Sequence, residues 1–343
     1  MRIMRMRSVE SYLQQQYENI MPEFRFQARN RNEWEKWRIG LRDALVHDLG
    51  GFPERRGPLK TAVMEKREYE DYWMQKITYQ MDDLLPVPSY VLIPKKKSRK
   101  MPAVLACHGH GRGCNEMLGL NLDGTDNTGD PGYQKKFPVE LVKRGFLVIA
   151  PEFLGFGERR LKADKEKRAD NSCYNISTNL LMMGSTMAAS RIYDAICAID
   201  YLESCDDVDI KRIGCMGISG GGLVAGFASA LDDRIRATVV SGYTNTFKNS
   251  IMSVYHCVDN FIPGVLKHAE LPDILGLIAP KPLLIESGTE DPIFPIKVTR
   301  ESYEQIGKVY RLLESEDKLD HDFFKGVHEI SGAKSYDFFG KWL

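Results

Sequence analysis

The chain has 343 residues, with 47 Lys or Arg against 47 Asp or Glu, so its formal net charge at pH 7 is zero. A chain of this length buries a substantial core, either as two average domains or as one large α/β domain with additions. Without net charge no overall field attracts nucleic acid or an anionic membrane surface, so we expect neither as a partner and favour a small, neutral substrate.

The arrangement of apolar residues and cysteines predicts a soluble, cytoplasmic protein. Basic residues occur in the first eight positions, but no apolar stretch follows them, and no run of about eighteen apolar residues occurs anywhere. The seven cysteines are odd in number and show no Cys-x-x-Cys spacing: Cys107, Cys114, Cys173, Cys197, Cys205, Cys215 and Cys257. This usage suits reduced thiols rather than a disulfide framework.

Residues 1–65 are predicted to form a helical N-terminal extension, with amphipathic helices over 8–20 and 32–49. The second helix carries an apolar stripe at helical spacing: Trp34, Trp37, Leu41 and Leu45. Gly50-Gly51 offers its C-cap. Such a stripe needs a partner surface, and at helical spacing it is core far more often than a ligand site.

Residues 66–343 are predicted to form a second domain that opens with an antiparallel hairpin over 72–80 and 88–93. Strands and helices then alternate, which is typical of an α/β fold with a mostly parallel, doubly wound sheet. The expected strands are 103–107, 146–150, 213–216, 237–241, 283–287 and about 309–313. The expected helices are 133–144, 186–203, 221–230 and 298–306.

Three connections in this domain are too long to be simple turns. They cover residues 112–132, 151–183 and 242–279, and each follows a predicted strand. Long loops at the carboxyl ends of parallel strands build the ligand site of a doubly wound sheet. We therefore expect these segments to form the walls and lid of such a site.

The run from Lys211 to Ala228 predicts a strand, a tight turn and a helix, with Ser219 on the turn. The Gly-x-Ser-x-Gly pattern of Gly217 and Gly221 around Ser219 occurs by chance in roughly one chain in ten of this length. Its position between a predicted strand and helix makes it more specific, because glycines there leave room for a strained turn that exposes the hydroxyl. Ser219 is the candidate nucleophile; the alternative is a glycine-rich turn that only packs closely or binds phosphate.

A serine nucleophile needs a histidine to take its proton and an acid to orient that histidine. Asp291 follows one predicted strand, and His328 lies in the loop before a closing helix. The order Ser219, Asp291, His328 is the one expected for an α/β-hydrolase. The fallback acid is Glu290, the fallback base is His321, and the weaker candidates are His47, His256 and His268.

The reaction also needs backbone N–H donors for the oxyanion, each worth about 3 kcal/mol. One expected donor is Gly220, and the second is expected from the turn of Gly109, His110 and Gly111. Metal binding is the rival interpretation of His108 and His110, but no further cluster at ligand spacing supports it in the sequence. No nucleotide or phosphate motif is present, so we expect neither a metal nor a cofactor.

From about residue 66 onward the chain resembles the α/β-hydrolase superfamily, near its acetyl xylan esterase and dienelactone-hydrolase-like branches. The matching stretches are Gln75–Tyr79, His108–Gly111, Arg191–Leu202, Gly217–Gly221, Ser287–Pro292 and Val327–Glu329. Sugar deacetylases carry an Arg-Gly-Gln motif and a glutamine after the nucleophile, where this chain has the His108 turn and Gly220. The resemblance implies an α/β-hydrolase catalytic domain over 66–343.

Together these patterns predict a serine hydrolase of carboxylic esters, acting on short acyl esters of a small, carbohydrate-like alcohol. Cleavage of a lactone, a carbon-carbon bond or a peptide-like amide by the same triad is the alternative. A binding or scaffolding protein with an idle triad is a third possibility. The expected partners are a small-molecule ester and a possible second copy of the chain.

Overall fold

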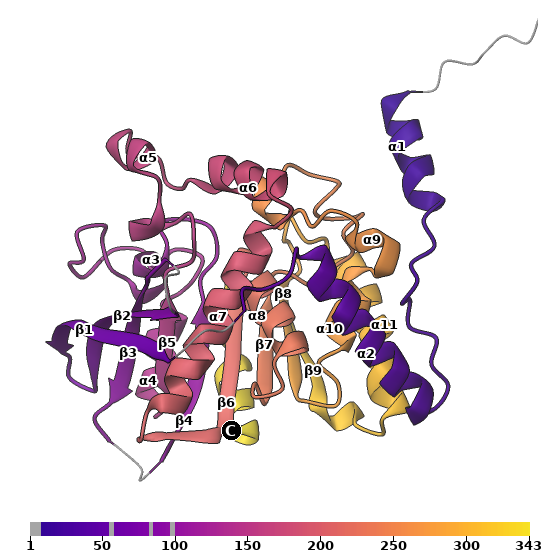
Figure 1. The fold of residues 1–343 in the computed structure, drawn as a ribbon. Coiled ribbons are helices and arrows are strands. Elements are labelled where there is room, and N and C mark those ends of the chain that lie inside the picture. Colours follow the sequence, from indigo (N-terminus) through magenta and orange to yellow (C-terminus); the bar gives the residue numbers. More distant parts are fainter. Residues whose placement is uncertain (1–7, 55–57, 82–84, 97–99) are drawn as a thin grey trace, which may run out of the picture.

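The computed structural model describes residues 8–54, 58–81, 85–96 and 100–343. In this part of the chain nine strands form one sheet, in the order β1-β2-β3-β5-β4-β6-β7-β8-β9 (Figure 1). The strands are β1 (Leu59–Glu68), β2 (Tyr72–Met81), β3 (Val87–Pro94), β4 (Met101–Cys107), β5 (Leu147–Pro151), β6 (Val208–Ile218), β7 (Ala237–Ser241), β8 (Leu283–Gly288) and β9 (Leu319–Phe324). The pairs β1–β2, β2–β3 and β3–β5 are antiparallel. The remaining neighbours in the sheet, from β5–β4 to β8–β9, pair in parallel. The predicted α/β fold with a mostly parallel sheet is confirmed.

Helices cover both faces of this sheet. The α-helices are α1 (Val9–Glu18), α2 (Arg31–Asp48), α3 (Cys114–Leu118), α4 (Phe137–Lys143), α5 (Lys162–Glu166), α6 (Cys173–Met182), α7 (Met187–Ser204), α8 (Gly220–Leu231), α9 (Val265–His268), α10 (Leu271–Gly276), α11 (Ile296–Leu312) and α12 (Ser335–Trp342). Short 3-10 helices are η1 (Gly157–Arg159), η2 (Val258–Asn260) and η3 (Glu316–Lys318). Helices α7, α8, α10 and α11 belong to one hydrophobic core, and α4 and α12 to the other.

Strand β4 shows how one sheet separates two cores. Leu105 and Cys107 point into the core under α7 and α8, whereas Val104 and Ala106 point into the core under α4 and α12. Successive side chains of a strand face opposite sides, so a strand covered on both sides must be apolar throughout. This explains why β4 reads as a continuous apolar run.

The second predicted helix, α2, packs into the same core as the sheet rather than standing apart. Its apolar stripe is buried, from Trp34 to Leu45. The Trp37 indole N–H donates to the Phe24 carbonyl at 2.7 Å, and Arg38 pairs with Asp233 at 2.6 Å. By contrast, no side chain of α1 is buried, and Figure 1 shows α1 projecting from the body.

Two strand predictions need correction. Strand β1 crosses the predicted boundary at residue 65, and it was not predicted because most of its side chains are exposed and show no apolar alternation. The strand predicted over 309–313 is wrong: those residues belong mostly to α11, and the last strand is β9. Ile306, Val309 and Tyr310 are buried together, so the apolar run continues the face of a helix.

The three long connections lie at the carboxyl ends of the parallel strands, as predicted. They contain short helices: α3 in the first, η1, α5 and α6 in the second, and η2, α9 and α10 in the third. Figure 1 shows α5 and α6 above the sheet. Among the described residues, no helix combines the length and apolarity needed to cross a membrane.

Candidate active site

Ser219 occupies a strained turn between β6 and α8. Its backbone angles are φ 56° and ψ −126°, in the left-handed half of the map that side-chain-bearing residues avoid. Its N–H donates to the Ser241 carbonyl at 3.0 Å. A Cβ at Gly217 would lie 2.1 Å from the Gly221 oxygen, and one at Gly221 would lie 2.1 Å from the Cys107 oxygen. Only glycine fits both positions, so the pattern around Ser219 is required by the turn itself.

Asp291 and His328 are joined by a hydrogen bond. His328 Nδ1 donates to Asp291 Oδ2 at 2.7 Å, while Asp291 Oδ1 accepts from the N–H groups of Ile293 and Phe294 at 2.8 and 3.0 Å. With its proton on Nδ1, a neutral imidazole presents a free lone pair at Nε2. That nitrogen is buried and has no hydrogen-bond partner among the described residues. The imidazole is therefore oriented to accept a proton at Nε2.

Aromatic rings hold the plane of this imidazole. The Tyr133 and Phe294 rings both stack against it, with centroids 5.8 and 5.7 Å away and interplanar angles of 21° and 14°. Gly242 lies between the His328 ring and the turn that carries Ser219. A Cβ at Gly242 would lie 2.9 Å from His328 Cε1, and Gly242 directly follows Ser241, whose carbonyl binds the Ser219 N–H. The ends of β6, β7 and β8 thus gather at one edge of the sheet.

The turn after β4 lies over the first turn of α8. A Cβ at Gly220 would lie 3.1 Å from His110 Nδ1, and the Tyr133 hydroxyl donates to the His110 carbonyl at 2.5 Å. Gly109 donates its N–H to Gln134 Oε1 at 3.0 Å. Because this N–H is already bound, Gly109 is a poorer candidate for the predicted second oxyanion donor than His110 or Gly111. The N–H of Gly220 begins a helix and has no acceptor within it.

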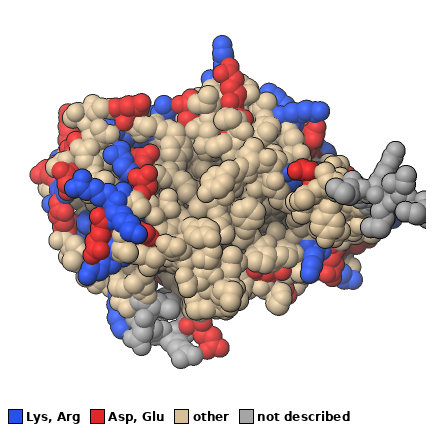
Figure 2. Space-filling model, turned by 90° about the horizontal axis from the view of Figure 1, so that it is seen from above, with Lys and Arg blue, Asp and Glu red and all other residues tan. Residues whose placement is uncertain are grey.

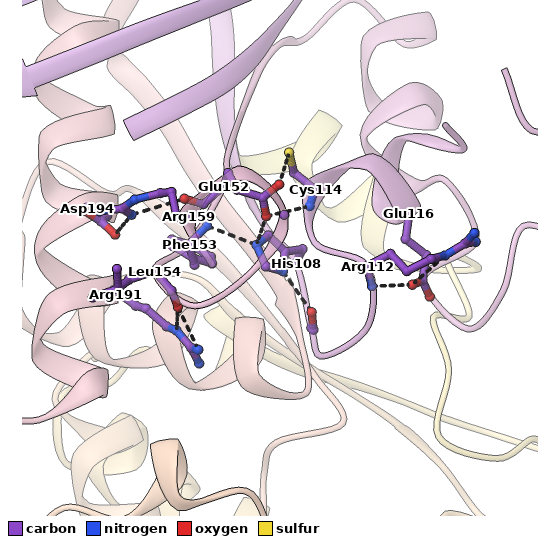
Figure 3. Close-up of polar contacts among 12 residues, drawn as sticks. His108, Arg112, Cys114, Glu116, Glu152, Phe153, Leu154, Arg159, Arg191 and Asp194 are labelled. Carbon is purple, nitrogen blue, oxygen red and sulfur yellow. Dashed lines mark hydrogen bonds and ion pairs between the residues drawn. The ribbon is translucent and has the colours of Figure 1, made fainter. Parts of the chain in front are cut away.

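His108 is buried, and its ring lies close to Glu152 and Phe153 (Figure 3). Its Nδ1 donates to the Gly109 carbonyl at 2.8 Å, and its Nε2 accepts from the Phe153 N–H at 3.1 Å. Both ring nitrogens are therefore used by the backbone. Glu152 lies on the same side and accepts from the Cys114 N–H at 3.1 Å. The pair of alternate histidines that suggested a metal in the sequence is split by the fold, with only His110 facing the candidate site.

Comparison with known proteins decides the family. The model of the Abhydrolase family matches residues 3–322. A relative from Bacillus subtilis, named "Putative hydrolase YtaP", is 31% identical over 282 residues, which are 80% of this chain and 88% of the relative. The chain belongs to the Abhydrolase family. The family match includes Ser219 and Asp291 and ends before His328.

Solved structures share the α/β-hydrolase fold of this Abhydrolase family member. A structure described as a "putative acetyl xylan esterase" from Bacteroides fragilis has a TM-score of 0.79 at 20% identity, covering 94% of this chain and 83% of that one. A glucuronoyl esterase from Solibacter usitatus has a TM-score of 0.69 at 15% identity, covering 94% of this chain and 98% of that one. At these identities the likeness concerns the fold.

In this Abhydrolase protein the acid-to-histidine hydrogen bond is made by Asp291 and His328 rather than by the other candidates considered in the sequence. Asp291, not Glu290, contacts His328, and Glu290 is exposed. His321, on β9, packs against Tyr303 of α11, with ring centroids 4.9 Å apart. His47 is exposed, and His268 pairs with Asp48. His256 contacts Ser250 and the Phe294 ring that stacks on His328, so it lies beside the candidate site.

His110 Nδ1 faces Gly220, and the other ring nitrogen, Nε2, belongs to a polar cluster. Asp259 Oδ2 accepts from His110 Nε2 at 2.9 Å and from Arg191 Nη1 at 2.6 Å. Burial alone would raise the pKa of Asp259, but the charges of Arg191 and His110 outweigh it and hold that pKa well below its ordinary value. Burial likewise opposes the charged form of His110, yet Asp259 raises the pKa of His110 to about 9.

Two cysteines complete this cluster. Ligand atoms of His110, Cys173, Cys257 and Asp259 all lie within 4.8 Å of one another. A hydrogen bond from Cys173 is the largest of the causes that lower the pKa of Cys257 to about 5. The four residues come from three separate segments, so no spacing in the sequence could reveal them.

A buried glutamate anchors the segment that follows His328. Glu286, on β8, accepts from the Ser241 hydroxyl at 2.8 Å, from the N–H groups of Ser331 and Gly332 at 3.2 and 3.0 Å, and from the Ser335 hydroxyl. These bonds tie β7, β8 and the His328 loop together. Burial nevertheless raises the pKa of Glu286 above its ordinary 4.5.

This raised pKa predicts a pH-dependent contribution to stability. The folded state holds the Glu286 proton more tightly than the unfolded state, so the contribution is fully present below about pH 4.5 and declines as the pH rises toward the folded pKa. We expect the difference in unfolding free energy between the native protein and Glu286→Gln to decline over that range, by at most 1.4 kcal/mol per pH unit. Urea unfolding across pH measures it. The exposed Glu316 provides the control Glu316→Gln, and equal slopes for the native protein and Glu286→Gln would contradict the assignment.

Proposed function

We propose that this protein is a serine hydrolase of carboxylic esters, with Ser219 as nucleophile, His328 as general base and Asp291 as its orienting acid. The observation that carries the proposal is the Asp291–His328 hydrogen bond, which leaves Nε2 as a buried, unpartnered acceptor. The strained backbone of Ser219 supports it, because a turn of this kind projects the side chain away from both strand and helix.

The reaction proceeds in two halves. His328 Nε2 takes the proton of the Ser219 hydroxyl as its oxygen attacks the ester carbonyl, and the imidazolium then gives that proton to the leaving alcohol. Asp291 stabilises the imidazolium without becoming protonated. The N–H groups of Gly220 and of His110 or Gly111 bind the oxyanion. Water, activated by His328, then releases the acid from the acyl-enzyme.

The substrate we propose is a short acyl ester of a small, carbohydrate-like alcohol. The face above the site supports a neutral ligand: Figure 2 shows Lys, Arg, Asp and Glu side chains mainly around its periphery, with few in the middle. Two of the fold neighbours carry names of carbohydrate esterases. A lactone, a carbon-carbon bond or an amide remains the second candidate, because the same triad serves each of these reactions.

A substrate panel tests this choice. We expect kcat/KM to be highest for acetyl esters and to fall at least tenfold as the acyl chain lengthens to eight carbons or more. The panel compares esters of increasing chain length with lactones and amides, using Ser219→Ala to subtract the background. A preference for lactones or amides would replace the proposed substrate class while keeping the triad.

Covalent labelling separates an enzyme from a binding protein with an idle triad. An activated serine reacts with a phosphonate ester, because that reagent mimics the carbonyl and traps the nucleophile. Mass spectrometry of the peptide that contains Ser219 therefore shows a phosphonate adduct if the triad works. A native protein that stays unlabelled at Ser219 would indicate a binding role.

A further inference from the structure

Beyond the proposed ester hydrolysis, we propose that His110, Cys173, Cys257 and Asp259 form a structural zinc site beside the candidate active site. Their ligand atoms all lie within 4.8 Å of one another. Histidine nitrogen, cysteine sulfur and aspartate oxygen are the ligands that zinc takes in proteins, and four protein ligands form a closed, tetrahedral structural site. The inference stands on this geometry and does not depend on the esterase proposal.

The distances are close to those that zinc requires. Bonds of about 2.3 Å to sulfur and 2.0–2.2 Å to nitrogen and oxygen place tetrahedral ligand atoms roughly 3.3–3.8 Å apart. The most widely separated ligand atoms therefore need to approach one another by about 1.5 Å at most, and the His110 and Asp259 atoms, now 2.9 Å apart, need to separate slightly. Cys257 can supply this movement, since it is half-buried and residues 255–257 lie outside any helix or strand.

Arg191 balances the charge of the site. Two thiolates and one carboxylate carry three negative charges, so bound Zn²⁺ leaves one, and the buried Arg191 guanidinium neutralises it. Arg191 already donates to Asp259 Oδ2 at 2.6 Å and to Cys173 Sγ at 3.1 Å, and two bonds to the Leu154 carbonyl fix it (Figure 3). Outer-shell donors of this kind orient metal ligands. Any protons on the thiols and the ring nitrogen leave for solvent as Zn²⁺ binds.

The site would join three segments that wall the candidate active site. His110 follows β4, Cys173 begins α6 within the second long connection, and Cys257 and Asp259 flank the start of η2 in the third. A metal bound by all three fixes the two insertions to the turn above Gly220. Thiolate and imidazole ligands favour Zn²⁺ over Mg²⁺ or Ca²⁺, which prefer oxygen ligands.

Cobalt provides the test, because Co²⁺ occupies zinc sites and reports its ligands by absorption. The full chain is stripped of metal with a chelator, kept under a phosphine reductant so that no disulfide forms, and titrated with Co²⁺. We expect a thiolate-to-cobalt charge-transfer band and tetrahedral d–d bands that saturate at one ion per chain and disappear on addition of Zn²⁺. We also expect Zn²⁺ to raise the melting temperature, because it binds the folded state.

Cysteine variants locate the ligands. Cys257→Ser and Cys173→Ser should each reduce the charge-transfer band by about half and weaken Zn²⁺ binding at least tenfold. The matched control is Cys205→Ser, since Cys205 is half-buried, lies outside the cluster and contacts the Tyr201 carbonyl. Ser219→Ala should bind Co²⁺ like the native chain, which separates this inference from the esterase proposal.

Two results would overturn the zinc site. One is a native chain that shows no charge-transfer band with Co²⁺ in excess, a measurement that needs no variant to fold. The other is a band of equal intensity in the native chain and in the double variant Cys173→Ser, Cys257→Ser, with far-ultraviolet circular dichroism showing that the variant is folded.

Discussion

Replacing Ser219 with alanine is expected to lower kcat for ester hydrolysis by about 10⁴- to 10⁶-fold while leaving the fold intact. Removal of a triad nucleophile costs this much because no other group forms the acyl-enzyme, and the residual rate comes from the oxyanion donors and substrate binding. Alanine keeps the Cβ that the turn already accommodates at φ 56°, so no new clash arises. Steady-state kinetics on an acetyl ester measures the loss.

Ser229 offers a matched control on the same helix. It is fully buried on α8, and its hydroxyl has no hydrogen-bond partner among the described residues, so Ser229→Ala should change neither kcat nor stability appreciably. If Ser219→Ala keeps its esterase activity while Ser229→Ala behaves like the native protein, Ser219 is not the nucleophile and the proposed mechanism fails.

Much of the fold could be predicted because its determinants are local. Helix α7 shows a clear helical period, and β7 is bounded by residues 237–241 in both the prediction and the structure. The two wrong strand predictions occurred where the apolar pattern of the sequence does not reflect the burial of the side chains in a strand. Strand β1 has few apolar residues because most of its side chains face solvent, and the end of α11 resembles a strand because Val309 and Tyr310 are adjacent and both buried.

The candidate site was predictable only where sequence constrains geometry. The glycines around Ser219 are dictated by backbone clashes, so they can be recognised without coordinates. The pairing of Asp291 with His328 was inferred from their order after Ser219 and from their positions in loops, although strand β9 itself was not predicted. In the structure the two residues follow neighbouring parallel strands, β8 and β9, whose carboxyl ends share an edge. The cluster around Asp259 could not, because its members come from long connections whose paths no periodicity describes.

Asp291→Asn is expected to lower kcat by about 10⁴-fold through the tautomer of His328. Asp291 Oδ1 accepts two backbone N–H groups, from Ile293 and Phe294, and an asparagine oxygen would keep both bonds. Its NH₂ group would then face His328 Nδ1 in place of a carboxylate oxygen. A neutral imidazole would have to accept at Nδ1 and carry its proton on Nε2, where it could no longer take the Ser219 proton.

Kinetics and nitrogen NMR together test this explanation. We expect the native imidazole to carry its proton on Nδ1 and the Asp291→Asn imidazole to carry it on Nε2, with stability nearly unchanged because the backbone bonds persist. Glu290→Gln is the control, since Glu290 is the neighbour of Asp291 and is exposed, whereas the hydrogen bond to the His328 imidazole is made by Asp291. A large loss in Glu290→Gln with near-native activity in Asp291→Asn would transfer the orienting role to Glu290. Loss of activity in Asp291→Asn without the change of tautomer would show that Asp291 acts through charge alone.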